Sequence, residues 1–323
     1  MSEARPIRLR RRRVAALVSL GALAGAVTGL LAGGHGSGSS GGPAGRAPGV
    51  SPGDTSGGAH VAQGAHTAAA AVLRRNVPLL SLPANAVART VHVPILTWHR
   101  VAVFAQEYTK SIPDETVEPS VFAREIDALA ADGYHPISQL QLFEALFHGA
   151  PLPPRPVLLT VDDGYVDDAR TILPILAAHH FVATFYIITH RFHEPGFLNT
   201  AEVRRLDQAG MDIGAHTRNH VALATVSAQE MVEQIAGSKR DLESVVGHPV
   251  QWFAYPFGSF SPAVVAEVRR AGFVLAVTTQ AGTSESSLSS LTMPRIHVGR
   301  EAGVSTVLAC TSSGACSGGG GGG

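Results

Sequence analysis

The sequence is poor in cysteine, in aromatic residues and in charge. Only two of its 323 residues are cysteine, which excludes a disulfide-rich scaffold and a zinc site built from four cysteines. Aromatic residues make up 6% and charged residues 15% of the chain, yet 45% is hydrophobic. That fraction is enough for a full core, so the chain is not disordered throughout.

The charge is unevenly distributed. Residues 1–32 contain six Arg and one Glu, and the whole chain has a formal net charge of zero, so the remainder carries a net −5. A slightly acidic body argues against nucleic acid as a partner, because phosphate binding needs clustered Lys and Arg.

The first 32 residues predict an export signal or a membrane anchor. Five Arg between positions 8 and 13 precede Val14–Ala32, which are 19 residues without a charge. A helix of that length is about 28 Å long, close to the hydrocarbon thickness of a bilayer. Basic residues ahead of an apolar stretch stay in the cytoplasm, so we expect the body outside it, secreted or anchored by this segment. A cleaved signal, a retained anchor and a twin-arginine signal all fit, whereas the Arg cluster disfavours a buried soluble helix.

Composition divides the rest of the chain into three segments. Residues 33–87 are rich in Gly, Ser, Ala and Pro and predict a disordered linker. Residues 88–310 predict one folded domain, and residues 311–323 predict a disordered Gly-rich tail. Cys310 and Cys316 lie six residues apart, and outside the cytoplasm they could form a small disulfide loop. Nothing in the sequence indicates an oligomeric state.

Within the predicted domain, apolar runs typical of strands alternate with segments of helical spacing. The predicted strands are 91–98, 156–161, 182–188, 212–215, 251–254, 273–278 and 295–298. The predicted helices are 120–131, 139–147, a segment ending near 178, 200–208, 227–246, 262–271 and 304–308. This alternation predicts an α/β fold with a parallel sheet closed into a barrel, whose chemistry would lie at the carboxyl ends of the strands.

Two of these strand ends carry groups that could bind a metal. Asp162 and Asp163 follow the strand 156–161, and a turn explains only one of them. A calcium loop does not fit, because Gly164 stands at a ligand position. His216 and His220 follow the strand 212–215 at a spacing of four, which in helical backbone turns both imidazoles to one side. In a chain with 15 His such a pair also arises by chance.

The third strand end is Phe253–Gly258. It is either a strand broken by Pro and Gly or a rigid loop that presents a backbone N–H and an aromatic wall.

Together the three strand ends resemble the polysaccharide deacetylase family, the carbohydrate esterases built on the NodB-homology domain. The family motif T-F-D-D-G resembles Thr160–Gly164, with Val161 in place of Phe. The motif H-[ST]-x-x-[HN] resembles His216–His220, and R-x-P-[YF]-G resembles Ala254–Gly258, where Ala254 replaces Arg. The resemblance covers roughly residues 90–300 and implies a distorted seven-stranded NodB-type (β/α) barrel.

Residues 93–99 resemble the V-P-[IV]-L-x-Y-H segment of one branch of that family, which includes exported poly-N-acetylglucosamine deacetylases. The resemblance implies that His99 is the catalytic acid, and His297 is the competing candidate for that role. Trp98 replaces the usual Tyr. Because Ala254 stands where the family has its orienting Arg, we expect Arg295 to approach from a neighbouring strand.

The resemblance also implies the metal site. Asp163, His216 and His220 would bind a divalent metal, and this set of one carboxylate and two imidazoles suits Zn²⁺, with Co²⁺ or Ni²⁺ as substitutes. Asp162 would be the general base and His99 the acid.

The substrate would be flanked by three aromatic residues, Tyr165, Phe257 and Trp98, with the backbone N–H of Phe257 stabilising the oxyanion. The expected activity is removal of N-acetyl groups from an extracellular or cell-wall aminosugar polysaccharide. The alternatives are an O-acetyl esterase acting on acetylated xylan or another glycan, a catalytically inactive carbohydrate-binding domain and, least favoured, a non-enzymatic scaffold tethered to the membrane.

Overall fold

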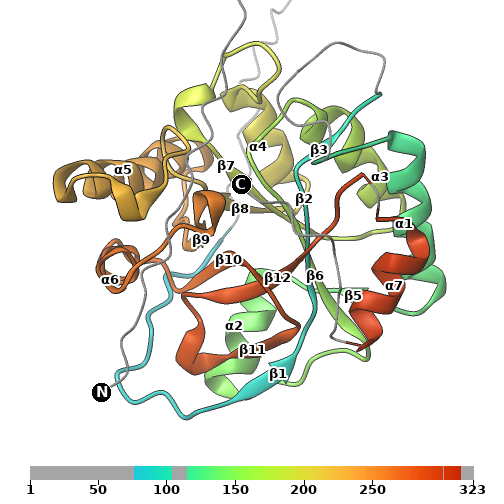
Figure 1. Ribbon diagram of the computed structural model, residues 1–323, viewed down its shortest axis with the longest axis horizontal. Helices are drawn as coiled ribbons and strands as arrows, with labels where there is room; N and C mark the ends of the chain where they lie inside the picture. Colours follow the sequence, from blue (N-terminus) through green and yellow to red (C-terminus); the bar gives the residue numbers. More distant parts are fainter. Residues whose placement is uncertain (1–75, 104–114, 301, 314–323) are drawn as a thin grey trace, which may run out of the picture. The chain divides into compact units, whose positions relative to one another are not determined.

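The computed structural model describes residues 76–103, 115–300 and 302–313 (Figure 1). The predicted signal or anchor, most of the predicted linker and Cys316 of the expected disulfide lie outside these residues, so they stay predictions. Within the described part of the chain, no helix combines the length and hydropathy needed to cross a bilayer.

Seven parallel strands close into a barrel (Figure 1). Their order is β2-β12-β10-β9-β8-β7-β6, and β2 also pairs with β6, so the first and last strands of the series join the two ends of the sheet. The strands are β2 (Ile95–Trp98), β6 (Pro156–Val161), β7 (Thr184–Ile187), β8 (Asp212–Ala215), β9 (Trp252–Ala254), β10 (Leu275–Ala281) and β12 (Met293–His297). This arrangement confirms the predicted seven-stranded α/β barrel.

Helices follow most of these strands along the chain. They are α1 (Pro119–Ala131), α2 (Gln139–His148), α3 (Leu173–Ala178), α4 (Thr200–Gln208), α5 (Ala228–Val246), α6 (Pro262–Arg270) and α7 (Val304–Ser313). Local sequence sets their ends: Asn199 and Glu202 form a reciprocal capping box on α4, and Gly247 ends α5 in the left-handed conformation.

Helix α2 covers the amino-terminal end of the barrel. Its apolar side chains belong to the same buried cluster as Ile95 and Leu158 of the barrel strands. The backbone N–H of Gln139 donates to Asp212 Oδ2 at 2.8 Å, which fixes the start of α2 beside the start of β8. The opposite end of the barrel, where the strands finish, is therefore left for the chemistry.

Several short elements were not predicted from the sequence, because a pairing of two or three residues leaves no periodicity. They are β1 (Thr90–His92), β3 (Arg100–Val101), β4 (Thr116–Val117), β5 (His135–Pro136), β11 (Ser284–Ser286), η2 (Asp168–Ile172), η3 (Thr189–Arg191), η4 (Leu223–Thr225), η5 (Pro256–Gly258) and η6 (Ser287–Ser289). Of these, η2 is a π-helix that leads into α3 within the segment expected to be one α-helix.

The segment 76–87 contacts the barrel, although the predicted linker extended to residue 87. The N–H of Leu80 donates to Gln251 Oε1 at 2.7 Å, and Gln251 Nε2 donates to the carbonyl of Pro78 at 2.9 Å. Pro78 and Leu80 therefore contact the barrel from within the predicted linker, and α7 ends at Ser313, within the predicted tail.

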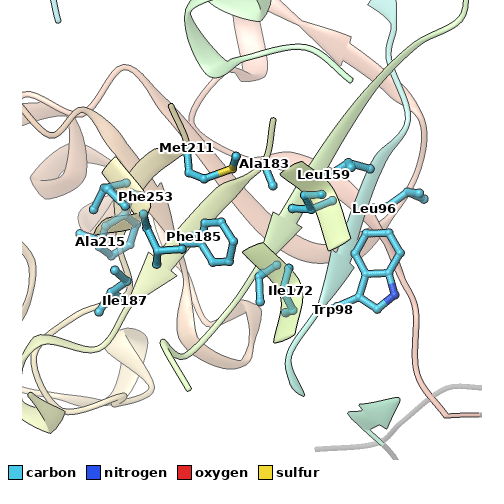
Figure 2. Packing of buried hydrophobic residues seen from close by; sticks show 14 of the residues in the cluster. Leu96, Trp98, Leu159, Ile172, Ala183, Phe185, Ile187, Met211, Ala215 and Phe253 are labelled. Carbon is cyan, nitrogen blue, oxygen red and sulfur yellow. The ribbon is translucent and has the colours of Figure 1, made fainter. Parts of the chain in front are cut away.

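The two faces of each barrel strand have different environments, because successive side chains of a strand point to opposite sides. In β2, Leu96 and Trp98 pack outward with Leu159 and Phe185 in the core between strands and helices (Figure 2). The alternate residues of the strands face the barrel interior, where apolar side chains near α2 give way to polar ones toward the strand ends. This alternation decides which side chains reach the site.

Candidate metal and catalytic site

At the carboxyl end of the barrel, polar side chains that face the interior from four strands lie close together. Asp162 follows the inward-facing Thr160 of β6 by two residues, and its N–H donates to the carbonyl of Trp98 at 2.9 Å. His99 follows Thr97 of β2 in the same way. Residues far apart in the sequence are thus brought to one place by strand register.

Asp163, His216 and His220 form a cluster that could hold a metal ion. Asp163 Oδ1 lies 3.6 Å from His216 Nε2 and 3.4 Å from His220 Nε2. Two ligand atoms that are each about 2.1 Å from a tetrahedral ion are about 3.4 Å apart, so the observed spacing fits a bound cation. Asp163 Oδ1 is also buried without a hydrogen-bond partner, as expected for an oxygen that would coordinate a cation.

The orientation of His216 fixes which nitrogen faces this cluster. Its Nδ1 lies 2.8 Å from the carbonyl oxygen of Ala254. Because a carbonyl can only accept, Nδ1 carries the proton and Nε2 presents its lone pair toward Asp163. The backbone of Ala254 thus supplies the group that orients the His216 ring in this cluster.

The two histidines converge through a loop rather than a helix. Thr217 and His220 both have positive φ, 64° and 55°, and the His220 N–H donates to Thr217 Oγ1 at 3.0 Å. Spacing alone suggested a helical turn, but these left-handed residues fold the loop back and bring the rings within 4.9 Å of each other. Backbone strain of this kind is characteristic of functional sites.

Burial sets the protonation state of the cluster. It lowers the pKa of His216 to about 4 and that of His220 to about 3, so both imidazoles are neutral near pH 7. Burial, with the Asp162 charge next, raises the pKa of Asp163 to about 8. A divalent cation would bind to the neutral imidazoles of His216 and His220 and would supply the counter-charge for the Asp163 carboxylate.

Asp162 has the opposite environment. Arg295 Nη1 donates to Asp162 Oδ1 at 2.8 Å and Nη2 donates to Oδ2 at 2.7 Å, a buried bidentate pair. Burial alone would raise the pKa of Asp162, but the Arg295 guanidinium holds it well below its usual value. Asp162 is therefore a permanently ionised carboxylate in a fixed orientation. The expected approach of Arg295 to Asp162 is observed, but Arg295 comes from β12, which pairs with β2 and β10 and is adjacent to neither β6 nor β9.

A set of hydroxyl and carbonyl groups holds Arg295 in place, and the sequence analysis did not identify it. Arg295 donates to Thr97 Oγ1 at 2.9 Å, to Thr160 Oγ1 at 3.3 Å and to the carbonyl of Thr278 at 2.9 Å. Each of these residues sits on a different strand, so only the barrel register reveals the network. An inward polar residue within an apolar strand is the one hint that the sequence offered.

His99 lies beside Asp162, with its Nε2 3.9 Å from Asp162 Oδ2. Burial lowers the pKa of His99 to about 4, so the ring is neutral in the free protein. His297 is its neighbour, with the ring centroids 5.3 Å apart. Both candidates for the acid therefore reach the site, and His99 is the one within 4 Å of the carboxylate.

Two of the three predicted substrate-flanking aromatics lie next to the cluster. The Phe257 ring is 4.5 Å from that of His220 and is 60% exposed. Phe257 has a positive φ of 57°, and at the next residue, Gly258, any Cβ would lie 2.1 Å from Thr279 Oγ1. The backbone of this loop is therefore tightly constrained. Tyr165 stacks on Phe197, with centroids 4.8 Å apart.

Trp98 is not brought to this surface, contrary to the expectation that it flanks the substrate. Its side chain is 1% exposed, its Nε1 donates to Glu125 Oε2 at 3.0 Å, and its ring meets Phe122 edge-on. The physical reason is strand alternation: Thr97 and His99 face the interior, so Trp98 points outward to α1.

Comparisons with known proteins agree with this geometry. Residues 149–276 match the family described as Polysaccharide deacetylase. The chain is 22% identical over 206 residues to YxkH of Bacillus subtilis, a match that covers 64% of this chain and 71% of that relative. It is 28% identical over 153 residues to a peptidoglycan-N-acetylglucosamine deacetylase of Bacillus cereus, covering 47% of this chain but only 54% of the relative.

Among solved structures, the chain is similar to the Streptococcus pyogenes deacetylase PplD in complex with acetate. The TM-score is 0.64 at 26% identity, and the match covers 68% of this chain and 98% of that chain. The barrel is thus the NodB-type fold that the sequence motifs implied.

Proposed function

We propose that this chain, whose residues 149–276 match the polysaccharide deacetylase family, is a metal-dependent hydrolase that removes N-acetyl groups from an extracytoplasmic aminosugar polysaccharide. One observation carries the proposal: Asp163 Oδ1 stands 3.4–3.6 Å from two imidazoles, while the adjacent Asp162 is clamped by Arg295. A carbohydrate-binding domain without activity would not need both the three candidate metal ligands and an ionised carboxylate beside them.

In this proposal Asp163, His216 and His220 hold one divalent cation, with Zn²⁺ best suited to the donor set and Co²⁺ or Ni²⁺ as substitutes. Such a cation, when bound, lowers the pKa of water and polarises the acetyl carbonyl. The remaining chemistry falls to side chains of the chain itself.

Asp162 takes a proton from the attacking water. Its low pKa makes it a weak base, so this proton transfer would need the lowered pKa of water that a cation held by Asp163, His216 and His220 would supply. Arg295 fixes the direction of the carboxylate, and each carboxylate oxygen keeps a lone pair beyond the one used by the guanidinium.

His99 delivers a proton to the leaving nitrogen. The ring is neutral in the free protein, and Asp162 Oδ2 lies 3.9 Å from its Nε2, so the proton removed from water has a short path to it. Amide cleavage needs this proton more than ester cleavage does, because an amine anion is a very poor leaving group. N-deacetylation is therefore the reaction that we propose, and O-deacetylation, which would use the same site, is the alternative.

Phe257 and Tyr165 are proposed to contact the substrate. The N–H of Phe257 would stabilise the oxyanion, and its exposed ring beside His220 would lie against the sugar or the acetyl group. An N-acetylated glycan fits a site with this aromatic border, and the Bacillus cereus relative is named for such a substrate.

The predicted signal or anchor in residues 1–32 would place this activity outside the cytoplasm, secreted or held at the membrane. A polysaccharide of the wall or the extracellular matrix is the substrate class that fits that location.

Acetate release tests the proposal. Purified protein would be assayed on peptidoglycan, chitin oligomers, poly-N-acetylglucosamine and acetylated xylan. We expect acetate from an N-acetylated polymer, its loss with excess chelator and its return with Zn²⁺ or Co²⁺. Full activity in chelator would refute the metal, acetate from xylan alone would favour the esterase, and no release from any polymer would favour a binding domain.

A further inference from the structure

A second cluster of metal-binding side chains lies beside Asp162. His99, Glu115 and His297 each offer one ligand atom, and these atoms all lie within 4.8 Å of one another. Among the described residues, this cluster and the triad of Asp163, His216 and His220 are the two that meet this criterion. We propose that His99, Glu115 and His297 form a second divalent-cation site, and that an ion bound there takes His99 out of catalysis.

Strand register brings the three residues together. β12 pairs with β2 so that His297 is the partner of Thr97, two residues before His99. β3 pairs with β4 so that Arg100 is the partner of Thr116, which places Glu115 opposite His99. His297 ends β12, His99 lies between β2 and β3, and Glu115 directly precedes β4. Strand pairing therefore holds all three residues in place, as a metal site requires.

The histidines supply two neighbouring donors. Their ring centroids are 5.3 Å apart and the rings are inclined at 57°. His99 Nδ1 is buried and has no hydrogen-bond partner, so one nitrogen of this ring is left for a ligand. His297 lies on the exposed side of the cluster, through which an ion could enter.

The donor set of two imidazoles and one carboxylate is the same as in the triad, so it suits the same divalent cations. The second site is more exposed than the triad, since His297 is exposed and Glu115 is half-buried, whereas Asp163 and His216 are buried. We therefore expect it to fill after the triad, at higher concentrations of Zn²⁺.

The functional consequence rests on the proposed function. An ion bound at the second site coordinates the imidazole of His99, which then cannot carry a proton to the leaving nitrogen. Activity should rise with the first equivalent of Zn²⁺ and fall as the second binds, by about 10²-fold, the low end of what a general acid contributes.

Metal stoichiometry tests the site whether or not the protein is a deacetylase. The full chain would be freed of metal, titrated with Zn²⁺ by calorimetry, and analysed for bound metal. The variants Glu115→Gln and His297→Ala remove second-site ligands, and Glu230→Gln and His92→Ala are exposed controls of the same types. Thermal unfolding would confirm that each variant is folded.

We expect each second-site variant to bind one equivalent of Zn²⁺ fewer than the parent and each control to bind the same number. In acetate release, Glu115→Gln should resist inhibition by excess Zn²⁺ that the parent shows. Equal stoichiometry in the parent and both second-site variants would overturn the proposal. If acetate release fails altogether while the stoichiometry differs as expected, the second site stands and the proposed deacetylase function fails.

Discussion

Two neighbouring carboxylates, Asp162 and Asp163, have opposite environments, and the contrast explains how one short motif can serve two purposes. Arg295 neutralises Asp162 and holds its pKa low, whereas burial and the Asp162 charge raise the pKa of Asp163 to about 8. Asp162 forms a buried ion pair with Arg295. Asp163 instead faces two neutral imidazoles, those of His216 and His220. Environments that push paired acids apart indicate separate catalytic roles.

The strongest test of this contrast replaces each carboxylate in turn with its amide. Asp162→Asn should keep the metal and lower turnover by about 10²–10⁴-fold, because it removes only the base. Asp163→Asn should lose metal affinity by at least about 10²-fold, with activity following. Bound metal and acetate release would be measured on the same samples. Loss of metal from Asp162→Asn would mean that the two roles are misassigned.

Removal of Arg295 should raise the pKa of Asp162, as burial already raises that of Asp163. Arg295→Ala leaves a buried carboxylate unpaired, which should cost about 3–5 kcal/mol of unfolding free energy at pH 7. The raised pKa of Asp162 should also move the acidic limb of kcat/KM to higher pH.

The control is Arg295→Lys, which keeps the charge but not the bidentate geometry, and should recover stability more than turnover. Urea denaturation and a pH–rate profile would give both quantities. An unshifted acidic limb in Arg295→Ala would argue that Arg295 does not tune Asp162.

The raised pKa of Asp163 predicts a pH-dependent metal affinity. Below pH 8 the metal must displace a proton from Asp163, so Zn²⁺ affinity should fall about tenfold per pH unit from 8 down to 5, with about one proton released per ion. The histidines add nothing in that range, because their pKa values are about 4 and 3.

The same shift acts on stability. A carboxyl whose pKa is raised in the folded state favours folding at low pH, and this contribution is lost as the pH rises toward 8. The gain in Tm from bound metal should therefore be larger at pH 8 than at pH 6. Calorimetry in buffers of different ionisation enthalpy would detect the proton. A pH-independent affinity would contradict the raised pKa.

The smallest effect on catalysis is expected outside the barrel. Trp98→Phe removes the hydrogen bond to Glu125 Oε2 and should destabilise the fold by about 1–3 kcal/mol, since it leaves a buried acceptor unsatisfied. Because Trp98 points away from the site, kcat should change less than about threefold. A large loss of kcat with unchanged stability would contradict this and indicate that Trp98 contacts the substrate.

The barrel was largely predictable because its strands and helices are long enough to show periodicity. Strand 156–161 and helix 200–208 appear with the bounds expected from the sequence. The short pairings β1–β11 and β3–β4 were not predictable, because two or three residues carry no pattern.

The candidate site was predictable where motifs adjoin a strand end, as for Asp162, Asp163 and His216. Trp98 was misplaced because its position was inferred from a motif rather than from the alternation of its strand. The contacts of Arg295 with Thr97 and Thr160, and the approach of Glu115 to His99, depend on the register between distant strands, which local sequence does not encode.

Anomalous diffraction from crystals soaked in one equivalent of Zn²⁺ would test the central claim most directly. The account predicts a peak at the zinc edge about 2.1 Å from Asp163 Oδ1 and from the Nε2 atoms of His216 and His220. A zinc peak elsewhere, with these three atoms left without an ion, would contradict it.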